Sequence, residues 1–343
     1  MQVSAVVWIV SILVVLGLFV FDFFSHVRTP HEPSLKESGF WSAVYISIAI
    51  LFGIGVWAVS GPRYGGEFFA GFVTEKALSV DNLFVFVIIM AKFAVPRIYQ
   101  QKVLLIGIVM ALVMRAGFIA VGAAAISTYS WVFYIFGAFL LYTAIKLVKE
   151  ASSPEGPVED EKEREGRVAA LFKKIVPTTE TYDGDKLITK VDGKKVATPL
   201  LLALVVIGFT DVLFALDSIP AIYGLTQEPY LVFMANAFAL MGLRQLYFLI
   251  GGLLDRLVYL SYGLSIVLGF IGVKLVLHAL HENTLPFING GEHLAVPEIS
   301  TGLSLSVILG VLVITTVASL IKSKRDGARE QVSSDVPSDS DTK

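Results

Sequence analysis

Long apolar runs separated by short polar segments make up most of the chain. Each run approaches the roughly 20 residues that an α-helix needs to cross the hydrocarbon core of a bilayer. The pattern therefore predicts an all-α polytopic membrane protein with about nine transmembrane helices. The runs cover residues 3–21, 40–59, 67–91, 102–124, 130–149, 199–224, 230–250, 259–280 and 301–321.

The apolar runs also divide the chain into segments. We expect the first run to be retained rather than cleaved, because it has no basic residues before it and no clear small-residue cleavage site. Alternating residues around Asp192-Gly193 predict a small hairpin. The expected segments are a transmembrane helix at 1–24, a membrane region at 40–149, a cytoplasmic loop at 150–198, a second membrane region at 199–280, an outer loop with the last transmembrane helix at 281–325, and a disordered cytoplasmic tail at 326–343.

Composition and charge placement agree with this pattern. The 343 residues are 55% hydrophobic and 16% charged, with a mean hydropathy of +0.73. Nine crossings put 22 of the 27 Lys and Arg residues on one side of the membrane and Arg63 alone on the other. Because cytoplasmic loops carry the excess of basic residues, we expect a multi-pass membrane protein with its N-terminus outside and its C-terminus cytoplasmic.

Several functional classes are disfavoured by what the sequence lacks. It has no cysteine, which excludes disulfides and thiolate metal sites. It has no GxxxxGK[ST] loop, which argues against direct ATP-driven transport by this chain. We expect no enzymatic activity, no permanently bound cofactor and no nucleic-acid partner, with the lipid bilayer as the surroundings. The oligomeric state is left open.

Two polar motifs inside apolar runs resemble each other. TEKALSVDN at 74–82 aligns without gaps to TDVLFALDS at 210–218. A second echo follows each motif, since ALVMRAGFI and ALMGLRQLYFLI place Arg115 and Arg244 inside the next run. Spans three to five (67–149) therefore correspond to spans six to eight (199–280). Because three is odd, the two copies cross in opposite directions, as in the inverted repeats of many secondary transporters.

The first motif carries an unusual number of ionisable residues for a membrane span. Asp, Lys or Arg at the centre of a span costs about 2.5–3.5 kcal/mol, so we expect partners, and Arg115 and Arg244 are natural ones. In a straight helix Asp81 points about 120° away from Glu75. Either Asp81 faces a different neighbour, or the helix is unwound at 79–82. Pro220 favours a break in the second copy.

The polar atoms of both motifs form an all-oxygen set. Carboxylates, an amide, hydroxyls and backbone carbonyls suit hard divalent ions such as Mn²⁺, Mg²⁺ or Ca²⁺. A salt bridge to Arg115 or Arg244 that only holds the bundle together is the alternative for the acids. For Asn82 and Ser218 the alternative is an ordinary interhelical hydrogen bond.

Three segments resemble the TerC family of tellurium-resistance-associated membrane proteins, and within it the Alx-like manganese exporters. They are EKALSVDNLFVF, FAVPRIYQQKVLLIGIVMALVMRAGFI and the stretch from TPLLLALVVIGFTDVLFALDSIPA to LRQLYFLI. The resemblance runs from about 40 to 321. It implies an inner-membrane protein of the LysE-like transporter superfamily that binds Mn²⁺ with the acids of both motifs. Gly208-Phe209 depart from the family pattern, because an acidic residue is expected there.

Carried over residue by residue, the resemblance gives a candidate metal site. The implied ligands are Glu75, Asp81, Asn82, Asp211, Asp217 and Ser218. The residues expected to support them are Thr74, Ser79, Arg115, Thr210, Asn236 and Arg244. We expect both arginines to organise the acids rather than to bind metal, because a permanent cation repels a divalent ion.

The leading functional hypothesis is a secondary transporter that exports Mn²⁺ from the cytoplasm by alternating access through a midplane carboxylate site. Proton antiport is a natural coupling, because acids that release a metal can take up protons. One rival is a membrane scaffold without transport activity, serving tellurite resistance or metal delivery to exported proteins. The other rival is a channel, whose flux would not depend on pH.

Overall fold

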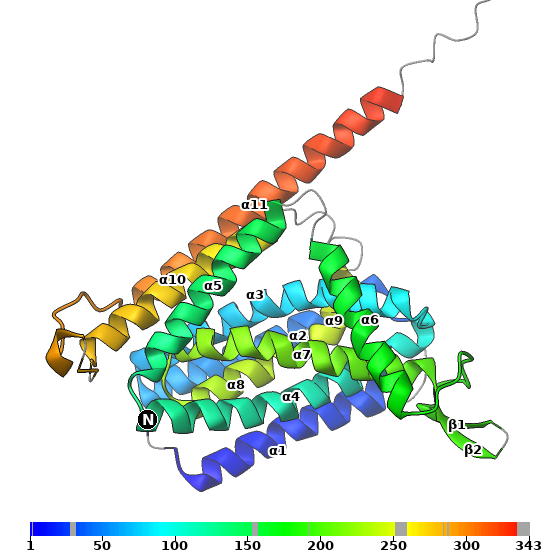
Figure 1. The fold of residues 1–343 in the computed structure, drawn as a ribbon, viewed down its shortest axis with the longest axis horizontal. Coiled ribbons are helices and arrows are strands. Elements are labelled where there is room, and N and C mark those ends of the chain that lie inside the picture. The colour runs from blue at the N-terminus through cyan, green and yellow to red at the C-terminus, as the bar shows by residue number, and fades with distance from the viewer. Residues whose placement is uncertain are drawn as a thin grey trace, which may run out of the picture.

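The structure is a computed structural model, and it describes residues 1, 3–27, 32–152, 157–191, 193–250, 259–283, 285–286 and 288–334. Helices dominate the fold (Figure 1). In chain order the elements are α1 (Ala5–Asp22), η1 (Phe23–Val27), α2 (Leu35–Ser60), α3 (Pro62–Lys92), α4 (Arg97–Thr128), α5 (Val132–Ser152), α6 (Pro157–Ile175), β1 (Ile188–Val191), β2 (Lys194–Ala197), α7 (Pro199–Tyr223), α8 (Pro229–Leu240), α9 (Leu243–Ile250), α10 (Leu260–His281), η3 (Asn289–Gly291) and α11 (Thr301–Ser334).

Eight helical segments of the described chain are long and apolar enough to cross a membrane. They match eight of the nine predicted spans, with α8 and α9 together making one. The ninth prediction, 67–91, corresponds to α3, whose 31 residues would extend about 46 Å. Helix α3 is not one of the eight apolar segments, because it carries too many charged side chains. The antiparallel pairing of β1 with β2 confirms the predicted hairpin, although Asp192 itself lies outside the described residues.

The helices form two groups. One group packs α1, α2, α3, α4, α7, α8 and α9 around a large apolar core. In the other, α5, α10 and α11 lean across these helices at an angle (Figure 1). Within the second group α5 approaches α10 closely at Gly137 and Gly272, where a Cβ on either glycine would lie 3.0–3.1 Å from the carbonyl oxygen of the other. Small residues allow such backbone contact between membrane helices.

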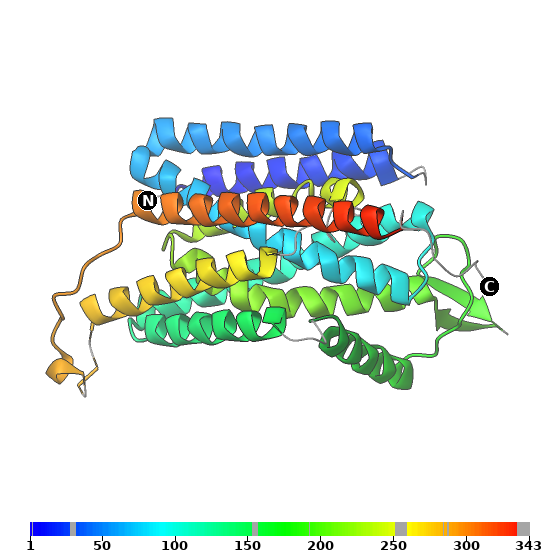
Figure 2. The same ribbon diagram turned by 90° about the horizontal axis from the view of Figure 1, so that it is seen from above.

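The connecting segments gather at the two ends of the bundle. The hairpin lies at one end, and the segment between α10 and α11 lies at the other (Figure 2). The N-terminus is at the same end as that segment, whereas α11 runs toward the end that carries the hairpin. The first residue and the end of α11 therefore lie toward opposite ends of the bundle.

The helix interruption lies elsewhere than predicted. The backbone of α3 stays helical through residues 79–82, and α7 continues through Pro220 to Tyr223. The prediction of a break at Pro220 is therefore wrong: a proline removes one helical hydrogen bond, and here the helix continues for three residues beyond it. The observed break separates α8 from α9 at Met241-Gly242, where Gly242 adopts a φ of +78° that favours glycine.

Candidate functional site

Arg115, on α4, is the centre of a buried polar cluster. Its side chain is fully buried. Nε and Nη2 donate to the two carboxylate oxygens of Asp211 on α7, at 3.2 and 3.1 Å. Nη1 donates to Glu75 of α3, to Asn236 Oδ1 of α8 at 2.9 Å, and to Ser218 Oγ of α7 at 3.4 Å. One guanidinium thus joins four helices, and it holds Asp211 with the two-pronged geometry that arginine provides.

This cluster brings together aligned positions of the two motifs. Glu75 and Asp211 occupy corresponding places in TEKALSVDN and TDVLFALDS, and both contact Arg115. The helices that carry them are packed around Arg115, since α4 packs on both α7 and α8, and α3 packs on the same two helices. The prediction that Arg115 organises these acids agrees with the geometry.

Three buried side-chain oxygens of α3, the helix that carries Glu75, make no hydrogen bond within the described residues. They are Glu75 Oε2, Thr74 Oγ1 and Ser79 Oγ. A buried acceptor without a donor costs about 1–3 kcal/mol, and more when it is charged. These atoms are therefore available to a cation or a proton.

The other predicted residues are distributed around this cluster. Asn82 is buried and Thr210 is half-buried. Asp217 accepts a hydrogen bond from Thr143 Oγ1 of α5 at 3.0 Å, and it is not among the residues to which Arg115 donates. The side chain of Asp81 lies outside the described residues. Within the side chains that are described, no three His, Asp or Glu residues gather as metal ligands usually do.

Arg244 occupies a different cluster, so the prediction that it organises the motif acids is wrong. Its Nη2 donates to Asp22 Oδ1 of α1 at 2.8 Å, and its Nη1 donates to Gln101 of α4. The same Asp22 oxygen accepts from Tyr45 at 2.7 Å and from Gln245 at 3.0 Å. The break before α9 places Arg244 in this cluster, on the half-helix that α2 packs against.

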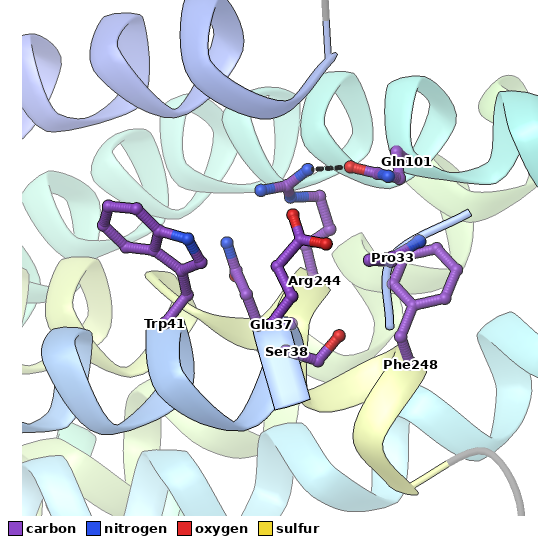
Figure 3. A pocket seen from close by; sticks show the side chains of 8 residues that line it. Pro33, Glu37, Ser38, Trp41, Gln101, Arg244 and Phe248 are labelled. Carbon is purple, nitrogen blue, oxygen red and sulfur yellow. Dashed lines mark hydrogen bonds between the residues drawn. The ribbon is translucent and has the colours of Figure 1, made fainter. Parts of the chain in front are cut away.

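A small, partly open pocket adjoins Arg244 (Figure 3). The side chains converge on it from α2, the start of α4 and α9, and the guanidinium of Arg244 lies at its wall, bonded to Gln101. Its lining consists of Pro33, Glu37, Ser38, Trp41, Gln101, Arg244, Gln245 and Phe248. Sequence reasoning missed Asp22 because a single acid at the end of an apolar run looks like an ordinary interfacial residue.

These observations define a class of protein: a multi-pass helical membrane protein with a buried, charged cluster at the meeting point of four helices. Comparison with known proteins gives the family. Residues 60–327 match the model of the integral membrane protein TerC family. The chain belongs to this family, which confirms the resemblance seen in the motifs.

Relatives within the family cover most of the chain. An uncharacterised membrane protein of Mycobacterium tuberculosis is 52% identical over 93% of this chain and 80% of its own length. A protein of Salmonella typhi named Alx, a proposed membrane-bound redox modulator, is 34% identical over 87% of this chain and 89% of its own. The thylakoid membrane protein TERC of Arabidopsis thaliana is 42% identical over 72% of this chain and 62% of its own. No solved structure matches the chain.

Proposed function

We propose that the chain is a secondary transporter that exports Mn²⁺ from the cytoplasm by alternating access, with the Arg115 cluster as its central site. The main support for this proposal is that Glu75 and Asp211, from aligned positions of the two motifs, both form ion pairs with the buried guanidinium of Arg115. Two carboxylates and one guanidinium leave one negative charge uncompensated. Since an unpaired buried charge costs several kcal/mol, the cluster favours uptake of a cation or a proton.

The donor set suits a hard divalent ion. Arg115 is surrounded by carboxylate, hydroxyl and amide oxygens, and the Glu75 carboxylate that it contacts has a second oxygen without a partner among the described residues. Oxygen ligands of this kind are preferred by Mn²⁺, Mg²⁺ and Ca²⁺. The guanidinium lies between the two acids, so we expect Mn²⁺ to bind as Arg115 releases one of them. Competition between the Arg115 guanidinium and Mn²⁺ for the same carboxylates would then couple Mn²⁺ binding to movement of the helices.

Helix packing supports an inverted repeat within a LysE-like architecture. In the proposed repeat α3 corresponds to α7, α4 to α8 and α5 to α10. Under this correspondence the contact between α3 and α8 should have a counterpart between α7 and α4. Both pairs of helices are in contact. The pair α5 and α10 maps onto itself and meets at Gly137 and Gly272. Such pseudo-symmetry would let the two repeats rock about Arg115.

Protons are the proposed coupling ion, because Glu75 and Asp211 can exchange a metal for protons. The family relative named as a redox modulator suggests a second role, but this chain has no cysteine with which to perform thiol chemistry. We infer that any redox effect would follow from the supply of a redox-active metal such as manganese.

Purified protein in liposomes with a Mn²⁺-sensitive dye inside tests the proposal. The parent is expected to move Mn²⁺, with flux that saturates and responds to an imposed pH gradient. Glu75→Gln and Asp211→Asn are expected to lower the initial rate at least about 10-fold. Absence of flux by the folded parent would favour the scaffold, whereas linear flux that ignores pH would favour a channel.

A further inference from the structure

The break between α8 and α9 leaves backbone carbonyls without helical partners inside the bundle. A helix cannot satisfy its last carbonyl groups internally, and α8 ends at Leu240. Away from water these groups need another donor, and broken membrane helices commonly use such carbonyls to bind cations. The negative end of the α8 dipole adds to the attraction.

The donor at this break is a side chain from another helix. Lys76 of α3 places its Nζ 2.9 Å from the carbonyl oxygen of Ala239 and 3.4 Å from that of Met241. Both carbonyls lie just before Gly242, which takes a left-handed conformation. Lys76 follows Glu75 directly in the sequence, but Glu75 pairs with Arg115. The Lys76 ammonium group therefore donates hydrogen bonds to carbonyl groups at the break between α8 and α9.

We propose that the carbonyl oxygens of Ala239 and Met241 form a monovalent-cation site, which the Lys76 ammonium fills from within the chain. An ammonium group is close in size to a potassium ion and is attracted by the same carbonyl dipoles. The tethered charge holds α3 against the α8–α9 break without any dissolved ion. This site is separate from the Arg115 cluster and does not depend on the chain being a Mn²⁺ transporter.

Removal of the ammonium should open the site to a dissolved ion. The test is thermal unfolding of the full chain in detergent, in choline chloride, sodium chloride or potassium chloride at equal ionic strength. The parent is expected to melt at the same temperature in all three salts. Lys76→Ala is expected to melt lower in choline and to gain about 2 °C or more in Na⁺ or K⁺, because an ion that binds only the folded state stabilises it.

Two further variants separate ion binding from general effects. Lys76→Met keeps the bulk of the side chain, so its melting temperature should be low in every salt. Lys274→Ala is the matched control, since Lys274 Nζ on α10 donates to the Ser304 hydroxyl at 3.2 Å and not to freed carbonyls. It should show no preference among the salts.

Lys76→Ser is measured in parallel, in case Lys76→Ala does not fold. A variant that can be purified only with Na⁺ or K⁺ present also supports the proposal. The proposal is overturned if neither small-residue variant is stabilised by Na⁺ or K⁺ over choline relative to the Lys274→Ala control. It is equally overturned if neither variant folds in any of the three salts.

Discussion

Arg115 and Arg244, which follow the two similar motifs in the sequence, lie in different surroundings. Arg115 is fully buried where four helices meet, and it is shared by two acids. Arg244 adjoins a pocket, and its ion pair is with Asp22, while neutral side chains make several of the remaining contacts. At Arg115 two acids share one guanidinium, whereas the ion pair of Arg244 is with the single acid Asp22, and Glu37 lines the adjoining pocket. A cation is therefore expected to act at the first cluster, where the shared guanidinium leaves one carboxylate charge unbalanced.

The largest effect is expected from Arg115→Met. This change leaves Glu75 and Asp211 facing each other without their shared counter-ion. Loss of one member of a buried ion pair costs about 3–5 kcal/mol, and here two acids are affected. Chemical unfolding in detergent should show a loss of at least this size, and Mn²⁺ flux should be absent.

A double variant checks the cause of that loss. Arg115→Met combined with Glu75→Gln removes the repulsion between the two acids, so the combined free-energy loss should be smaller than that of Arg115→Met alone. Additive losses would show that the guanidinium acts through packing and not through charge.

A smaller effect is expected from Arg244→Met. Asp22 would retain its hydrogen bonds from Tyr45 and Gln245, so unfolding should become easier by about 3 kcal/mol, the low end of the cost of breaking a buried ion pair. Mn²⁺ flux in liposomes should persist at a rate within about twofold of the parent. If folded Arg244→Met protein transports no Mn²⁺, the functional distinction between the two clusters is wrong.

The smallest effect is expected at an ion pair outside the bundle core. Lys102 Nζ donates to Asp185 Oδ2 at 2.7 Å, and this hydrogen bond lowers the pKa of the half-exposed Asp185 carboxyl. Because the pKa of Asp185 is lower in the folded state, its ion pair stabilises the fold at pH values above the ordinary pKa of Asp. This stabilisation is lost as the pH falls through the pKa of Asp185 in the folded protein.

Lys102→Ala should therefore cost only about 0.2–1 kcal/mol at neutral pH. The difference from the parent should narrow when unfolding is measured below pH 4, because Asp185 is then becoming protonated. A difference that is unchanged by acid would mean that Lys102 acts through its carbonyl contact with Asp185 at 2.9 Å and not through the carboxylate.

Much of this organisation could be predicted from the sequence. The hydropathy pattern gives the helices, and the alignment of the motifs pairs Glu75 with Asp211 before any coordinates are known. An acid in a membrane span needs a counter-ion, which is why Arg115 could be chosen as the partner. These inferences succeed because they depend on local pattern and on the high cost of buried charge.

The rest depended on tertiary contacts that no local pattern contains. Met241-Gly242 lies within an apolar run, and its break is stabilised by Lys76, which is distant in sequence. The break changes where Arg244 is placed, so its partner Asp22 could not be deduced from the repeat. At Pro220 the sequence predicted a break that the structure does not have, because a proline near the end of a helix does not have to break it.

Direct binding of Mn²⁺ to purified protein tests the central claim that the Arg115 cluster takes up a cation. Electron paramagnetic resonance titration should show one tightly held Mn²⁺ per chain in the parent. Binding should be lost in Glu75→Gln and retained in Asp22→Asn, the matched change at the acid that pairs with Arg244. Equal binding by parent and Glu75→Gln, or loss of binding in Asp22→Asn alone, would contradict the account.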